Sequence, residues 1–77
     1  MATLDEKLTT FLNDSLNISV DQTSAPLISA GLIDSMQVLE VALFLERETG
    51  LALEESDMVV ENFDTIDAMV ALCQARG

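Results

Sequence analysis

The 77-residue chain has fourteen acidic and three basic side chains, a formal net charge of −11, and 49% of its residues are apolar. This length fits one small domain, and the apolar content predicts a packed core, which an acidic disordered tail would lack. The negative charge repels phosphate backbones and anionic lipid, so nucleic acid and membrane surfaces are poor partners and a basic protein surface is a better one. By composition alone, a solvated surface that keeps a small protein soluble is the simpler explanation.

The scarcity of cysteine and histidine argues against disulfides and metal sites. The single cysteine, Cys73, excludes an internal disulfide and is compatible with a reducing compartment. Because it lies on the apolar stripe of the last expected helix, we interpret it as a small buried hydrophobe. With no histidine and no cysteine cluster, we expect no metal site. The sequence shows neither a secretory leader nor the ~18 continuous apolar residues of a membrane span. We therefore expect a soluble, cytoplasmic monomer.

The first expected element is a helix over residues 3–16. Thr3 followed by Glu6 forms a Thr-x-x-Glu capping box, and apolar residues then recur at helical spacing. From residue 17 to residue 33 the helical period breaks in a stretch that includes Pro26 and Gly31, which predicts a long loop. Connections this long are uncommon in compact domains and are often functional. Its aliphatic residues predict that the loop folds back onto the helices; they are Ile18, Val20, Leu27, Ile28, Leu32 and Ile33.

A second helix is expected to begin at Asp34 or Ser35 and to run to residue 49. Both residues are good N-caps, and Gln37 stands three residues after Asp34 in a weak form of the capping box. The run stops at Gly50, where a C-terminal glycine cap belongs. One apolar stripe is expected to face the core; it consists of Val38, Val41, Ala42 and Leu45.

Two further helical segments complete the chain. Residues 54–63 predict a single short helix that begins at Ser56 or Asp57. Asp64 or Thr65 then caps a last helix, whose apolar stripe is Ile66, Met69, Val70 and Cys73. The expected fold is all-α: a small bundle of three main helices plus one short helix, with a long loop between helices 1 and 2 and residues 1–77 forming a single domain.

Intrinsic catalysis is not expected. The sequence has no Ser-His-Asp set, because it has no histidine, and it has neither a glycine-rich phosphate loop nor a calcium-binding loop. Its many carboxylates could supply an acid–base pair, but no apolar cleft is expected that would raise the pKa of one of them. If the domain takes part in chemistry, it does so as a substrate or platform for other enzymes.

Ser35 can be interpreted in two ways. In isolation it is a helix cap, because an Asp-Ser pair before an apolar periodic run is typical of helix starts. The whole stretch GLIDSMQVLEVALFLERETG, however, resembles the acyl carrier proteins and the related peptidyl carrier proteins. Their signature is Asp-Ser-Leu or a similar tripeptide at the start of the second helix, after a long loop, and here the tripeptide is Asp34-Ser35-Met36. The later DMVVENFDTIDAMVAL resembles the third and fourth helices of that family, so the resemblance covers essentially the whole chain.

The resemblance implies that Ser35 is esterified with 4′-phosphopantetheine, which a separate phosphopantetheinyl transferase takes from coenzyme A with Mg²⁺. A helix N-terminus tolerates the phosphodiester anion, because its unpaired N–H groups carry a partial positive charge. The resemblance also implies that the second helix is recognised by three kinds of enzyme. They are the transferase, an acyl- or aminoacyl-loading enzyme, and downstream synthase or tailoring enzymes with basic surfaces. The recognition residues are then Asp34, Met36, Gln37, Glu40, Leu43, Glu46 and Glu48.

The identity of the cargo follows less directly from the sequence. Carriers of this family serve fatty-acid, polyketide or nonribosomal peptide biosynthesis, and GLIDSM followed by VLEVALFLERETG looks more like the discrete carriers of secondary metabolism. We therefore favour an aminoacyl or specialised acyl cargo. Because the chain begins with Met1 and ends shortly after the last expected helix, we expect a stand-alone carrier. The alternative function is an unmodified acidic helical adaptor that binds a basic partner surface through the same second helix.

Overall fold

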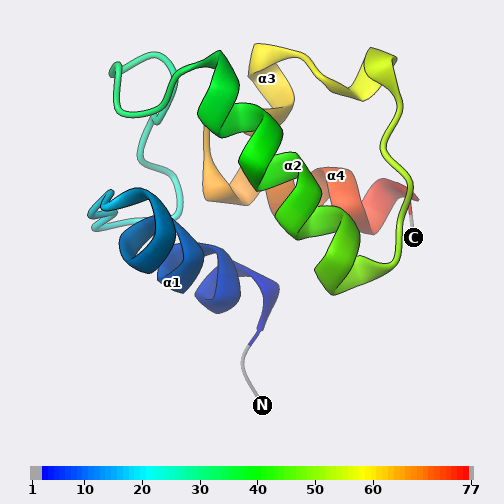
Figure 1. The fold of residues 1–77 in the computed structure, drawn as a ribbon, viewed down its shortest axis with the longest axis horizontal. Coiled ribbons are helices and arrows are strands. Elements are labelled where there is room, and N and C mark those ends of the chain that lie inside the picture. The colour runs from blue at the N-terminus through cyan, green and yellow to red at the C-terminus, as the bar shows by residue number, and fades with distance from the viewer. Residues whose placement is uncertain (1–2, 77) are drawn as a thin grey trace.

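The computed structural model describes residues 3–76, and within that range every regular element is helical (Figure 1). In chain order the elements are α1 (Leu4–Leu16), α2 (Ser35–Thr49), the 3₁₀ helix η1 (Glu55–Asp57), α3 (Val60–Phe63) and α4 (Ile66–Arg76). The prediction of an all-α bundle with three main helices, one short helix and a long loop between the first two is confirmed.

The ends of the first two helices follow from local sequence signals. At the start of α1 the Thr3 N–H donates to a Glu6 carboxylate oxygen at 3.1 Å, as the capping box predicts. The last turn of α2 ends at Gly50, whose φ of 74° lies in the left-handed region that glycine adopts without a Cβ clash. The Gly50 N–H donates to the carbonyl of Glu46 at 2.8 Å, so a carbonyl of the last turn is satisfied.

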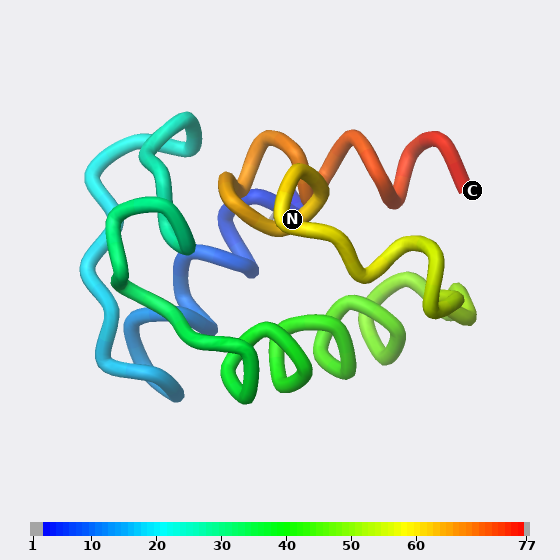
Figure 2. The backbone as a smooth tube through the Cα atoms, turned by 90° about the horizontal axis from the view of Figure 1, so that it is seen from above, coloured from blue at the N-terminus to red at the C-terminus, as the bar shows by residue number. Residues whose placement is uncertain are grey.

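The core lies where α1, α2 and α4 face one another. The apolar stripe predicted for α2 is confirmed, because Val41, Ala42 and Leu45 are buried and Val38 packs against the core. α1 contributes Leu8 and Leu12, α3 contributes Phe63, and α4 contributes Ile66, Met69 and Cys73. Seen from above, the loop of residues 17–34 closes one end of this bundle and the connection of residues 50–59 closes the other (Figure 2).

The long loop folds back onto the helices, as its aliphatic residues predict. Ile18, Leu27 and Ile33 are buried members of the core. Leu32 is an exception, because 46% of its surface is exposed. Two backbone hydrogen bonds tie the loop to the start of α4: the Leu27 N–H donates to the Asp64 carbonyl at 2.6 Å, and the Asp67 N–H donates to the Thr23 carbonyl at 3.0 Å.

The predicted start of the short helix at Ser56 or Asp57 is wrong, because α3 begins at Val60. η1 and α3 are separate, and Val59 between them has an extended backbone, with φ −118° and ψ 154°. Side chains here form hydrogen bonds with backbone groups that a continuous helix would use. The Asp57 carbonyl accepts a hydrogen bond from Asn62 Nδ2 at 2.9 Å, and the Asp57 carboxylate binds both the Glu54 N–H and the Arg76 guanidinium, at 2.9 and 2.6 Å.

Within residues 3–76, no helix combines the length and the apolar character needed to cross a membrane.

Candidate functional site

The residue that caps the start of α2 is Asp34 and not Ser35. Asp34 is the N-cap: its Oδ1 accepts the Gln37 N–H at 2.9 Å, and Gln37 Oε1 in turn accepts the Asp34 N–H at 3.0 Å. The weak capping box is therefore complete in both directions. The interpretation of Ser35 as the cap is wrong, because Ser35 is the first residue inside the helix and the cap position before it is already occupied.

Ser35 is left accessible by this arrangement. The residue is exposed, and its hydroxyl forms no hydrogen bond with any residue of the described chain. It stands at the N-terminus of a 15-residue helix, where unpaired backbone N–H groups and the helix dipole create a partial positive charge. The neighbouring carboxylate, Asp34, is engaged as the cap. Ser35 therefore offers a free hydroxyl to an external reagent, but a base that activates it must come from a partner.

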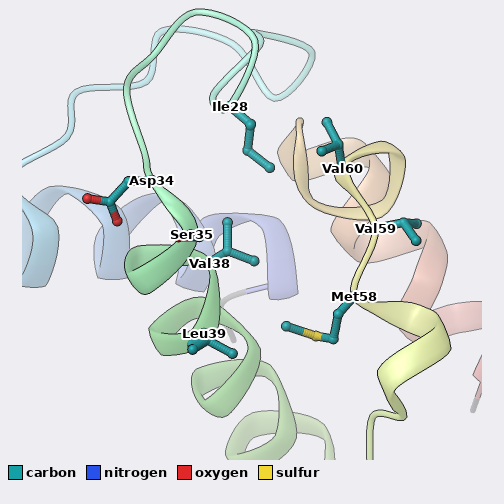
Figure 3. Close-up of a pocket in the computed structure, with 8 residues that line it drawn as sticks. All are labelled: Ile28, Asp34, Ser35, Val38, Leu39, Met58, Val59 and Val60. Carbon is teal, nitrogen blue, oxygen red and sulfur yellow. The ribbon is translucent and has the colours of Figure 1, made fainter.

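An apolar groove of about 350 Å³ opens beside Ser35 (Figure 3). Asp34 and Ser35 stand at its α2 end, and its other lining residues are apolar: Ile28, Val38, Leu39, Met58, Val59 and Val60. These apolar residues come from three separate segments, namely the long loop, the first turns of α2, and residues 58–60, which follow η1 and begin α3. Met58 points across the groove toward α2, and Ile28 points from the loop into the space between α2 and Val60 (Figure 3).

Three large apolar side chains of α2 face solvent near this groove. Met36, Leu39 and Leu43 are 69%, 54% and 61% exposed, and their spacing of three and four residues places them on one helix face. Exposed apolar side chains gathered in this way are typical of protein contact surfaces. The predicted recognition set includes Met36 and Leu43 but not Leu39, although Leu39 lies outside the buried stripe and at helical spacing from both.

The polar residues of the predicted recognition set divide into two groups. Glu40 is exposed between Met36 and Leu43. Glu46 and Glu48, by contrast, already have partners within the chain: a Glu46 carboxylate oxygen accepts the Leu53 N–H at 2.8 Å, and Glu48 forms a salt bridge with Lys7 of α1 at 3.2 Å. Gln37 is engaged in the capping box. The structure therefore brings Glu40 together with the exposed apolar face and turns Glu48 toward α1.

Asp64 and Thr65 are the two residues predicted to cap α4, and the structure assigns this role to Thr65. Thr65 is the cap of α4, since its Oγ1 accepts the Ala68 N–H at 2.9 Å. The Asp64 carboxylate instead binds the long loop: Oδ1 accepts the N–H groups of Leu27, Ile28 and Ser29 at 3.2, 2.9 and 2.9 Å, and Oδ2 accepts the Ser29 hydroxyl at 2.6 Å.

The Ser29 hydroxyl and these backbone N–H groups hold the pKa of Asp64 below its ordinary value. No local pattern reveals this contact, because 35 to 37 residues separate the carboxylate from its donors.

Cys73 takes no part in this site. It is 6% exposed in the core, and burial raises the pKa of its thiol, so the interpretation as a small hydrophobe is confirmed. Among residues 3–76, no three His, Cys, Asp or Glu side chains are grouped so that they could hold a metal ion.

A small helical bundle that exposes a free serine hydroxyl at a helix start, beside an apolar groove, is suited to bearing an attached group. The chain matches the phosphopantetheine attachment site family over residues 6–73 and therefore belongs to it. Members of this family are carrier domains: they bear a covalently attached 4′-phosphopantetheine and do not themselves catalyse a reaction, which confirms the expected family, cofactor and lack of enzymatic activity. They interact with phosphopantetheinyl transferases and with synthase enzymes. Neither the curated proteins nor the solved structures yield a match to this chain.

Proposed function

We propose that Ser35 is the residue to which 4′-phosphopantetheine is attached, and that the whole chain acts as one carrier domain. The observation that carries the proposal is the exposed hydroxyl of Ser35, which has no hydrogen-bond partner within residues 3–76 and stands at the positive end of α2. The backbone N–H groups of the first helical turn accommodate a phosphodiester anion at this position. When bound, the group supplies a terminal thiol on a long flexible arm, which holds the cargo as a thioester.

The transferase and the later enzymes recognise the start and outer face of α2 in this proposal. The exposed apolar residues, Met36 and Leu43, supply the area that a partner buries, and Glu40 steers a basic surface toward it. Leu39 joins this surface as a contact residue. Asp34, Gln37, Glu46 and Glu48 act at its edges, because each also holds a contact within the chain.

For the cargo, we propose an aminoacyl or specialised acyl group with an apolar side chain. The groove beside Ser35 supports this choice, since its volume of about 350 Å³ is that of a small-ligand site and every side chain beyond Asp34 and Ser35 in its lining is apolar. A charged cargo side chain would have no partner among these residues. The enzymes served are then a loading enzyme of the acyltransferase or adenylating class and a synthase or tailoring enzyme that takes the group onward.

Intact-mass spectrometry tests the attachment. The protein is incubated with coenzyme A, Mg²⁺ and a phosphopantetheinyl transferase of broad specificity. We expect wild type to gain the mass of one phosphopantetheine, Ser35→Ala to gain none, and the control Ser56→Ala, at an exposed serine of η1, to gain one as wild type does. A wild type that gains nothing would refute the proposal and favour an unmodified acidic adaptor; a Ser35→Ala variant that still gains the group would refute Ser35.

The cargo proposal has its own assay. Phosphopantetheinylated protein is offered to an adenylating enzyme with ATP and a panel of amino acids, and in parallel to an acyltransferase with a panel of acyl thioesters. We expect the loaded mass to correspond to an apolar group. Efficient loading of acidic or basic amino acids in preference to apolar ones would refute the argument from the groove.

A further inference from the structure

The hydrogen bonds of Asp64 hold one wall of the groove. Ile28 is the apolar residue that the long loop contributes to the described lining, and its N–H donates to Asp64 Oδ1 at 2.9 Å. The N–H groups on either side, of Leu27 and Ser29, donate to the same oxygen. Three consecutive N–H groups that converge on one carboxylate oxygen fix the backbone direction at Ile28, and therefore the side from which its side chain enters the groove.

The same contact determines how the loop approaches α2. The segment after Ser29 turns back on itself: the Gly31 N–H donates to the Ile28 carbonyl at 3.0 Å, and the Leu32 N–H donates to the Leu27 carbonyl at 2.8 Å. This compact turn ends at the buried Ile33, immediately before Asp34 and Ser35. The turn is thus anchored at its beginning by Asp64 and at its end by the core and by the cap of α2.

We propose that Asp64 is a positioning residue for the carrier site: by holding residues 27–29, its carboxylate fixes the Ile28 wall of the groove and the turn that presents Ser35 to partner enzymes. This inference rests on the proposed attachment at Ser35. Within residues 3–76, Asp64 forms no hydrogen bond with Ser35 and does not line the groove, so in this proposal it acts through the loop. The partner for which it matters most is the transferase, which must bring its own base to the Ser35 hydroxyl in the correct geometry.

Three variants separate positioning from general stability. Asp64→Ala removes the clamp, by which we mean the hydrogen bonds from residues 27–29 to the Asp64 carboxylate, and it leaves the Asp64 carbonyl, to which the Leu27 N–H also donates at 2.6 Å. Asp64→Asn keeps the Oδ1 acceptor for the three N–H groups, and its amide can donate to the Ser29 hydroxyl. Asp14→Ala is the charge-matched control, because Asp14 is exposed on α1 and its side chain makes no hydrogen bond or salt bridge within residues 3–76.

Each variant is studied at a temperature where it is fully folded. The measurements are kcat and KM for phosphopantetheinyl transfer, amide hydrogen exchange at residues 27–29 compared with α1, and the methyl signal of Ile28. We expect Asp64→Ala to lower kcat/KM about tenfold or more, a loss typical of a misplaced reacting group. Exchange should accelerate at residues 27–29 while α1 stays protected, and the Ile28 methyl signal should shift. Asp64→Asn and Asp14→Ala should behave as wild type.

Two results would overturn the inference. One is a folded Asp64→Ala variant that is modified at the wild-type rate; the other is exchange that accelerates equally in α1 and in residues 27–29, which would mean that Asp64 stabilises the whole fold without positioning the loop. Failure of the attachment proposal is distinct, because wild type and Asp14→Ala would then also remain unmodified. In that case the exchange data and the Ile28 methyl signal would still test whether Asp64 positions the loop.

Discussion

Asp34 and Ser35 are adjacent but have different roles: Asp34 caps α2, and Ser35 is the proposed attachment residue. Two substitutions should distinguish these roles. Asp34→Ala removes the carboxylate that accepts the Gln37 N–H at 2.9 Å and leaves that N–H to water. Ser35→Ala removes a hydroxyl that forms no hydrogen bond within the described chain and places a good helix former at the first helical position. The first change should therefore destabilise the fold, and the second should abolish modification.

The expected sizes differ enough to measure. Loss of an N-cap side chain costs about 0.5–2 kcal/mol, typically ~1 kcal/mol. In a domain of this length, ~1 kcal/mol lowers Tm by roughly 4–8 °C. Ser35→Ala should remain within about 0.5 kcal/mol of wild type, as surface substitutions usually do. Asp34→Asn should keep nearly full stability, because asparagine caps helices about as well as aspartate.

Thermal unfolding followed by circular dichroism, together with urea titration, checks these values on unmodified protein. A loss of stability in Ser35→Ala as large as that in Asp34→Ala would show that the serine hydroxyl caps α2 in solution. That result would refute the assignment of Asp34 as the sole cap, and with it the argument that the Ser35 hydroxyl is free. A destabilised Asp34→Asn variant would equally contradict the capping geometry.

Three further predictions follow from burial, surface charge and the lowered pKa. Leu45→Ala should cost about 2–5 kcal/mol in urea titration, because the side chain is fully buried, whereas Leu43→Ala in the same helix should cost less than about 0.5 kcal/mol. Glu40→Lys should slow phosphopantetheinyl transfer without changing Tm, while Glu61→Lys, the same charge change at an exposed site of α3, should leave the rate unaltered. The folded pKa of Asp64 lies below its ordinary value of 3.8, so its stabilisation is present above that value and is lost as pH falls through the folded pKa. The Tm difference between wild type and Asp64→Ala should therefore narrow from about pH 6 to about pH 2.

Each of these has an outcome that contradicts it. Equal losses in the two leucine variants would contradict the assignment of buried and exposed faces on α2. Equal slowing by both glutamate substitutions would indicate a general charge effect with no local recognition. A Tm difference at Asp64 that stays constant or widens as the pH falls would contradict the lowered pKa.

Local signals predicted most of the fold correctly. The capping box at Thr3, the glycine after α2 and the apolar period of each main helix depend on residues within four positions of one another, so they can be recognised in the sequence. The same signals could not decide between Asp34 and Ser35, because both residue types cap helices and only the observed geometry assigns the position. The local signals also predicted one continuous helix where the structure has η1 and α3. The Asp57 carboxylate binds Arg76 and its carbonyl binds Asn62, and these contacts separate the two helices.

The sequence by itself therefore determined the helical class, the approximate extents of the main helices and the resemblance of the chain to carrier domains, because these depend on short-range patterns and on their order along the chain. The observed local geometry assigned the cap of α2 to Asp34, whereas tertiary contacts decided where the groove lies and what holds its wall. The groove combines Ile28, Val38 and Met58 from three segments, and the clamp joins Asp64 to donors more than thirty residues earlier. Such contacts arise only when the chain is folded, because burial of the apolar stripes brings distant segments together and no local pattern records which polar groups then meet.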